Sequence, residues 1–143
     1  MNLQMATQHA LFAILELAAR PDQQMSASEI AEKYRISPNH LSKVLRTLGR
    51  EGLVEAVRGV GGGYRFVGNA KRINLLDIIR IFEPIGMRPT HGKEPGDDTF
   101  EGRALNMVMD EIDSMTRATL SSITVDTMLK LSRRTAAASA AAE

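Results

Sequence analysis

The segment from Ser37 to Arg50 places short polar side chains at its start and cations further along. Amide, imidazole and hydroxyl groups can form hydrogen bonds with base edges, and Lys and Arg side chains can neutralise phosphates. We expect base contacts from Asn39, His40 and Lys43, and phosphate contacts from Ser37, Ser42 and Arg46. The chemistry that these residue types offer is recognition of a nucleic acid.

A second set of candidates follows at residues 58–65. Four glycines lie within five residues of Gly59-Val60-Gly61-Gly62-Gly63, where they permit positive φ angles and close backbone approach to a ligand. Arg58 and Arg65 flank this turn, so cations would be carried toward the same partner. The sequence therefore adds five DNA-binding candidates, which are Arg58, Gly59, Gly61, Gly62 and Arg65.

Local signals predict the elements that position these residues. Ser26 with Glu29 has the form of a capping box, and Ser37 followed by Pro38 marks the start of a second helix. The inward face of that second helix is Leu41, Val44, Leu45 and Leu48, and Gly52 ends it in a left-handed conformation. Strands are expected over 53–58 and 64–67. The fold class is mainly α, a winged helix-turn-helix with a small two-stranded β-wing.

Each of these features has a plainer interpretation. A helix-turn-helix also occurs in protein-interaction modules, and a glycine-rich turn can simply close a hairpin. Lys43, Arg46 and Arg50 could form a solvated helix face. A protein-interaction adaptor that kept the fold is therefore the rival to a DNA-binding protein.

The stretch SPNHLSKVLRTLGREGLVEAVRGVGGGYRFV resembles the Rrf2 family of bacterial transcription regulators. VRG-x-x-GG after a capped helix pair carries the resemblance, and NHLSK is similar to the nitric-oxide-responsive repressors of that family. The resemblance covers Met1 to about Leu131. It implies a homodimer on a palindromic operator, and repression more readily than activation.

The family commonly holds an iron–sulfur cluster through three cysteines in the segment that corresponds to 84–102. This chain has no cysteine, so a conventional thiolate-held cluster cannot form. His91 with Asp97, Asp98 or Glu101, together with His9 of a partner subunit, could in principle bind another metal, but a solvated acidic loop is the favoured interpretation. We expect no cofactor, and a small-molecule effector stays open.

Composition limits the other function classes. The chain has 143 residues, enough for one compact domain with an extension. Residues 1–72 hold ten Lys/Arg and six Asp/Glu, giving +4, and residues 73–143 hold eight and eleven, giving −3. No apolar run approaches a membrane span and no signal peptide is evident, so a cytoplasmic protein is expected. Three scattered histidines and no cysteine offer no nucleophile–base pair, which argues against an enzyme.

Helices are also predicted outside the central segment. One covers 1–20, where His9 is expected to be a surface or packing residue, and another begins after Asn74 and stops at Glu83. A helix of about eighteen residues from Arg103 has an apolar stripe that is expected to pack against the first helix, to form a dimer, or both. In the resembling family the corresponding long helix crosses its twin. The predicted dimerisation residues are Leu105, Val108, Met109, Ile112, Met115 and Leu120.

The predicted organisation has three parts. Residues 1–72 form the DNA-binding domain, and residues 73–131 form a connecting helix, a sensor-type loop over 84–102 and the dimerisation helix. Thr124 caps a last short helix over 125–131. The Ala-rich tail, residues 132–143, is expected to be disordered.

Overall fold

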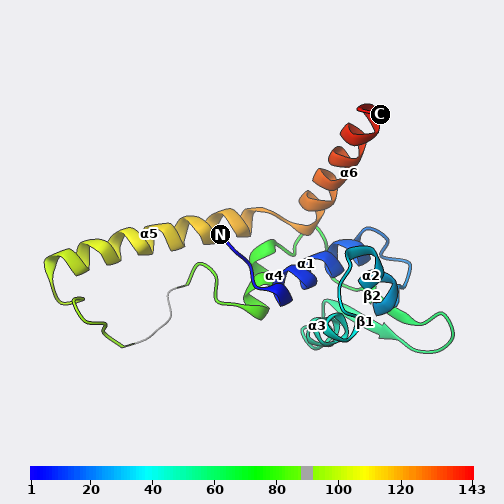
Figure 1. The fold of residues 1–143 in the computed structure, drawn as a ribbon, viewed down its shortest axis with the longest axis horizontal. Coiled ribbons are helices and arrows are strands. Elements are labelled where there is room, and N and C mark those ends of the chain that lie inside the picture. The colour runs from blue at the N-terminus through cyan, green and yellow to red at the C-terminus, as the bar shows by residue number, and fades with distance from the viewer. Residues whose placement is uncertain (88–91) are drawn as a thin grey trace.

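The computed structural model describes residues 1–87 and 92–143. Six helices and one two-stranded antiparallel sheet are present in this part of the chain (Figure 1). In chain order the elements are α1 (Met5–Ala18), α2 (Ala27–Tyr34), α3 (Pro38–Arg50), β1 (Val54–Val57), β2 (Gly63–Phe66), α4 (Leu75–Phe82), α5 (Phe100–Ser122) and α6 (Val125–Ala141). The mainly helical winged helix-turn-helix predicted from the sequence is confirmed.

The predicted capping residues lie at the N-terminal ends of their helices. The Ser26 hydroxyl accepts from the amide of Glu29 at 3.1 Å, and the Ser37 hydroxyl accepts from the amide of His40 at 3.5 Å. At α4 the capping box is complete, since Asn74 and Asp77 each accept from the other's amide. The box is incomplete at Ser26, because the Glu29 carboxylate accepts from the Ser26 hydroxyl instead of the Ser26 amide.

The turn follows α2 directly, and the wing follows α3 directly. Arg35 ends α2 in the left-handed region with φ 55°, and Gly52 follows α3 with φ 78°. In the wing, Glu55 pairs with Arg65 and Val57 with Gly63. Met25, just before α2, exchanges two backbone hydrogen bonds with Tyr64, so the wing is tied to the start of the helix pair.

One main core holds α1, α2, α3 and the wing together. Its fully buried members include Ile14 and Leu17 from α1, Ile30 from α2, and Leu41 and Leu45 from α3. Ile78 from α4 and Val125 from α6 belong to the same cluster. The main core therefore extends past residue 72, where the sequence suggested a domain boundary.

The long helix α5 projects away from this core (Figure 1). It begins at Phe100 with Thr99 as its cap, three residues earlier than expected, and runs for 23 residues. Leu120 is its buried residue, and it packs with Leu76 and Ile79 in a second, smaller cluster. Most of the apolar side chains of α5 are thus exposed in the described part of the chain.

The prediction for the C-terminus is wrong. Thr124 does cap α6, but the helix continues for 17 residues to Ala141, where a short helix and a disordered tail were expected. Alanine has the highest helix propensity of all residues, so an Ala-rich segment joined to a capped helix can extend it. Low complexity was a poor guide here. Of the described helices, none is long and apolar enough to cross a membrane.

Candidate nucleic-acid interface

Helix α3 divides into a buried apolar side and an exposed polar side. Leu41, Val44, Leu45 and Leu48 are buried, as predicted. The candidate contact residues lie on the other side, where Ser37, Asn39, His40, Lys43 and Arg46 are exposed and Ser42 is half-buried. The apolar positions hold the helix in the core and leave the polar side chains on its outer surface.

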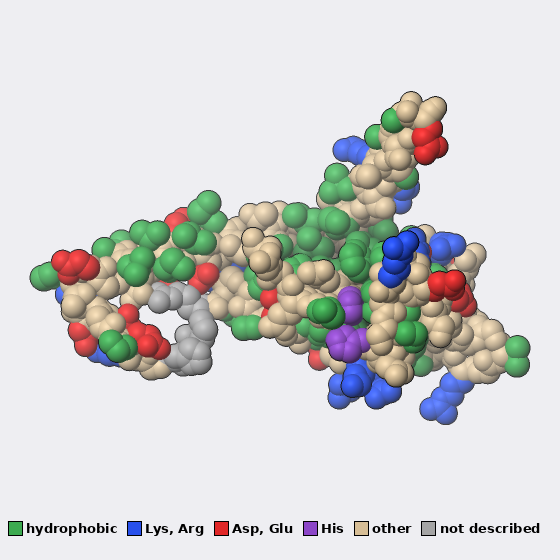
Figure 2. Space-filling view, viewed as in Figure 1, with side chains coloured by type: hydrophobic (Ala, Val, Ile, Leu, Met, Phe, Trp, Pro, Cys, Tyr) green, Lys and Arg blue, Asp and Glu red, His purple; other side chains and the backbone are tan. Residues whose placement is uncertain are grey.

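Three cations of the predicted interface have no acidic partner. Within the described residues, no carboxylate lies within ion-pairing distance of Lys43, Arg46 or Arg58. In Figure 2 one group of Lys and Arg side chains lies at the lower edge, under α3 and beside the wing, and others lie at the upper right and along α6; a group of acidic side chains lies around the far end of α5. This edge of the molecule is therefore a positively charged surface.

Arg65 differs from the other cations. It lies opposite Glu55 in the strand pair, and its guanidinium forms an ion pair with the Glu55 carboxylate at 3.4 Å. This pair neutralises much of the charge that Arg65 would offer to phosphate. The structure thus makes Arg58 the stronger candidate of the two arginines that flank the turn.

Backbone conformation and lack of space explain why glycines occupy the wing turn. Gly59 and Gly61 adopt φ angles of 104° and 74°. A Cβ atom on Gly62 would lie 2.3 Å from the Val57 carbonyl oxygen, which leaves no room for a side chain. The turn therefore requires glycine at these positions whether or not they contact phosphate.

A buried carboxylate fixes α2 against α1. Glu16 accepts from the Tyr34 hydroxyl at 2.6 Å and from the Lys33 ammonium at 2.7 Å, and Arg20 lies at 3.3 Å. Burial by itself raises the pKa of Glu16, but the hydrogen bonds from Lys33 and Tyr34 lower it overall. Burial and the hydrogen bond to Glu16 raise the pKa of Tyr34. This network holds the helix pair in place behind the interface.

His9 lies beside the recognition helix, a contact that sequence reasoning missed. Its ring meets that of His40 edge to face, with centroids 5.8 Å apart. The His9 Nδ1 atom is buried and has no hydrogen-bond partner among the described residues. Burial, together with the neighbouring His40, lowers the pKa of His9. The helical spacing of α1 alone could not reveal a contact that depends on how two helices pack.

Most of the residues predicted for dimerisation lie on an exposed face of α5. Leu105, Val108, Met109, Ile112 and Met115 are between 40% and 62% exposed. We call these five residues the α5 apolar face. Leu120, also predicted for this role, is 7% exposed and packs with Leu76 and Ile79 in its own chain.

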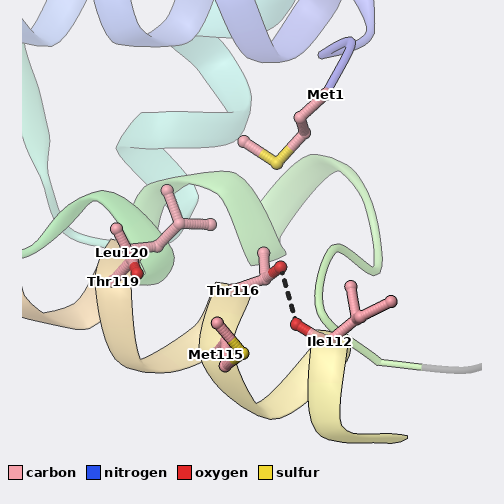
Figure 3. Close-up of a pocket in the computed structure, with 6 residues that line it drawn as sticks. All are labelled: Met1, Ile112, Met115, Thr116, Thr119 and Leu120. Carbon is pink, nitrogen blue, oxygen red and sulfur yellow. Dashed lines mark hydrogen bonds between the residues drawn. The ribbon is translucent and has the colours of Figure 1, made fainter. Parts of the chain in front are cut away.

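A shallow pocket of about 300 Å³ lies at the inner end of the α5 apolar face. Ile112, Met115, Thr116, Thr119 and Leu120 line it from α5, and Met1 lines it from the opposite side. Figure 3 shows these side chains around the opening, with the Thr116 hydroxyl turned back to the carbonyl of Ile112. The pocket is therefore apolar and large enough to accept a side chain.

The acidic loop before α5 uses its carboxylates within the chain. Asp97 accepts from the amide of Glu94 and from the side chain of Asn106, and Asp98 pairs with Lys93 at 3.0 Å. No group of three or more His, Asp or Glu suited to a metal ion occurs in residues 1–87 and 92–143. His91, the other metal candidate, lies outside the described residues.

The wing tip holds a residue that sequence reasoning passed over. Val60 is fully exposed at the end of the turn between β1 and β2. An exposed apolar side chain at the tip of a wing can contact sugars or the floor of a minor groove. The signal was available in the sequence, since Val60 is the one apolar residue among four glycines.

These features define a class. A capped helix pair with an exposed polar second helix, followed by a basic wing, is the arrangement of winged helix-turn-helix DNA-binding proteins. The comparisons with known proteins agree with this class and narrow it.

The sequence matches the family model for Rrf2, described as iron-dependent transcriptional regulators, over residues 3–131. The chain belongs to the Rrf2 family of transcriptional regulators, which are not enzymes. It is 52% identical over 131 residues to a protein of Rhodopseudomonas palustris named as the HTH-type transcriptional regulator BadM, covering 92% of this chain and 83% of that one.

Solved structures show the same fold. CymR, the global cysteine regulator of B. subtilis, superposes with a TM-score of 0.77 at 24% identity, over 92% of this chain and 98% of that one. IscR of T. potens gives a TM-score of 0.68 at 26% identity, over 92% of this chain and 88% of that one.

The family description names iron, but the side chains of this protein cannot hold an iron–sulfur cluster through thiolates. Iron–sulfur clusters are held by cysteine thiolates, with histidine replacing some of them in certain sites. The chain contains no cysteine, and Asp97 and Asp98 already have partners in the loop.

Proposed function

We propose that the chain acts as a homodimeric repressor that binds a two-fold-symmetric DNA site without a cysteine-ligated iron–sulfur cluster. The observation that carries the proposal is the pairing of two exposed surfaces in one chain. The exposed side of α3 is polar and cationic, and the α5 apolar face is uncovered. The first surface suits DNA, and the second suits another copy of the same chain.

The geometry of α3 supports major-groove binding. The N-terminal residues of a recognition helix contact base edges, and cations further along contact phosphates. Asn39, His40 and Lys43 are exposed in the first turns of α3, and Arg46 follows one turn after Ser42. Arg58 is exposed directly after β1 in the wing, from where it could contact the flanking minor groove or backbone.

The α5 apolar face supports a dimer. A helix that projects into water with Leu105 62% exposed and Ile112 49% exposed is unfavourable, because its apolar side chains stay hydrated and its turns lack tertiary support. A second α5 laid across it would bury both faces. The pocket lined by Met1, Ile112 and Met115 could then receive an apolar side chain from the partner (Figure 3).

A two-fold dimer leads to a two-fold DNA site. Each recognition helix would read one half-site, and half-sites in such complexes lie about 34–36 Å apart or at multiples of that distance. The basic half of the chain holds a net charge of only +4, as counted above, so two copies on one duplex would also bind more strongly than one. Repression follows if the bound dimer overlaps a promoter.

Sedimentation velocity with two labelled duplexes tests this proposal. The first duplex holds a complete two-fold site obtained by selection from a random library, and the second holds one half-site with the other half scrambled. We expect two chains on the complete site and much weaker binding to the half-site. One chain per duplex with equal affinity for both would contradict the dimer.

Matched lysine variants connect the result to α3. Lys43→Ala should lower affinity, whereas Lys93→Ala, which removes an exposed lysine from the acidic loop, should leave affinity unchanged. Equal behaviour of the two variants, or no sequence preference in any duplex, would favour the adaptor interpretation. Transcription in vitro from a promoter carrying the site then separates repression from activation.

A further inference from the structure

A groove of about 550 Å³ separates α1 from the start of α3. Met5, Gln8, His9 and Phe12 line it from α1, and Ser37 and His40 line it from the recognition helix. Figure 2 shows the histidine side chains next to each other above the basic edge of the molecule. The groove joins the first helix directly to residues expected to contact DNA.

The two histidines have the spacing of rings that share a metal ion. Two imidazoles bound to one ion at metal–nitrogen distances of about 2.0–2.1 Å have ring centroids roughly 5–6 Å apart. The centroids of His9 and His40 are 5.8 Å apart and the ring planes are inclined by 77°. The rings already lie near the separation that chelation requires.

His9 also has a nitrogen without a partner. Buried polar atoms in folded proteins almost always form a hydrogen bond, so an exception calls for an explanation such as a water molecule or an ion. The Nδ1 atom of His9 is buried and has no partner in the described part of the chain. A metal ion bound at this nitrogen would supply the missing partner.

Met5 lies one helical turn before His9 and lines the same groove. Residues four positions apart on a helix lie on one face, so the Met5 thioether is placed on the side of α1 that carries the His9 ring. Thioethers select Cu(I) among biological metals, and imidazoles bind copper, zinc, nickel and iron. Copper is the metal that both donor types share.

We propose that Met5, His9 and His40 bind a copper ion in this groove and that the bound ion removes His40 from DNA contact. Copper binding is independent of the proposed function, whereas the effect of copper on DNA contact rests on it. With three protein donors and an opening to solvent, binding would be reversible and suited to a sensor. The effect on DNA would follow because chelation with His9 holds the His40 ring toward α1 and into the groove, away from a position that reaches a base edge.

Competition with a chromogenic Cu(I) chelator, under ascorbate and without oxygen, tests the metal site in the full-length protein. We expect one Cu(I) per chain for the unaltered protein. His9→Phe should weaken binding about tenfold or more, because an aromatic ring is kept while the donor is lost. Met5→Leu should weaken Cu(I) binding and leave any Zn²⁺ binding by the two imidazoles unchanged.

His91→Ala is the matched control, since it removes the remaining histidine of the chain. It should leave Cu(I) binding unchanged, and circular dichroism should show that all three variants fold. Loss of binding in His91→Ala with none in His9→Phe would place the metal elsewhere and overturn the proposal. An unchanged Cu(I) affinity in Met5→Leu would overturn the choice of copper.

Fluorescence anisotropy with the selected duplex tests the regulatory part. With a chelator present, the unaltered protein and His9→Phe should bind DNA equally well. Added Cu(I) should weaken DNA binding of the unaltered protein about tenfold, the loss expected for one base contact, and should not affect His9→Phe. If DNA binding fails even with chelator, the proposed function is wrong; if it succeeds and Cu(I) has no effect, the regulatory inference alone is wrong.

Discussion

Helices α3 and α5 are both amphipathic, yet the chain uses their apolar sides in opposite ways. On α3 every apolar position of the stripe is buried in the main core, and the exposed side is polar. On α5 the apolar side is exposed, and Leu120 alone is buried in the described structure. The apolar side of α3 is thus fully packed within one chain, whereas most of the apolar side of α5 is exposed among the described residues.

Burial within one chain accounts for the packing of α3 but not for the apolar side of α5. Hydrophobic burial stabilises a helix only when another surface covers the apolar side. The core covers the apolar side of α3, whereas Leu105, Val108 and Met109 in the first turns of α5 are exposed. Substitutions on the two helices should therefore affect different properties of the protein.

The largest effect is expected from a charge on the α5 apolar face. Ile112→Asp would place one unpaired carboxylate from each protomer in the proposed dimer interface. The dissociation constant of the dimer should rise roughly 100-fold or more. Sedimentation equilibrium measures this change. Ser114→Asp introduces the same charge on the other side of α5 and should leave the dimer intact. Equal dissociation constants for the two variants would remove the assignment of this face.

A cavity at the inner end of α5 should affect folding instead. Leu120→Ala removes a side chain packed with Leu76 and Ile79, and should lower the free energy of unfolding by about 2–4 kcal/mol. Urea denaturation at fixed protein concentration measures the loss. Met107→Ala truncates a side chain that is 73% exposed on the same helix and should change stability little. If the two variants unfold alike, Leu120 does not belong to a core.

The polar side of α3 should control selectivity. Asn39→Ala should cost about 1–3 kcal/mol of discrimination at one base-pair position, because a base-edge contact is lost. Anisotropy with duplexes substituted at each position measures it. Arg46→Ala, with a phosphate contact, should lower affinity uniformly across these duplexes. Reversed behaviour of the two variants would exchange their roles.

The smallest effect is expected at the wing. Arg58→Ala should lower DNA affinity and reduce the slope of log affinity against log salt by about 0.9, the value for one phosphate contact. Its melting temperature should not change, since Arg58 is exposed and no described carboxylate pairs with it. Arg80→Ala removes an exposed cation from α4 and serves as the control. Unchanged affinity in Arg58→Ala would remove the wing from the interface.

The sequence was most informative where signals are local. Ser26, Ser37, Asn74 and Thr124 each mark a helix start through a hydrogen bond within a few residues, and all four cap helices in the structure. Gly52 takes the positive φ expected of it. Caps and turns depend on neighbouring residues, so their chemistry can be read directly from the chain.

Packing between distant segments could not be read in this way. The hydrogen bonds between Met25 and Tyr64 and the contact of His9 with His40 join residues that are at least 31 positions apart. Leu120 fits the apolar stripe of α5 as well as Ile112 does, and only the position of α4 assigns it to the core. The predicted contacts with DNA remain predictions, as do the dimer and the absence of a cofactor.

Fluorescence anisotropy of the purified, metal-free protein tests whether the chain binds a specific DNA sequence. The duplex selected from a random library is compared with a shuffled duplex of the same composition at two salt concentrations. We expect tight binding to the selected duplex and a preference for it that persists as salt is raised, because base contacts are less sensitive to salt than phosphate contacts. Weak binding that follows salt and ignores sequence would contradict this expectation.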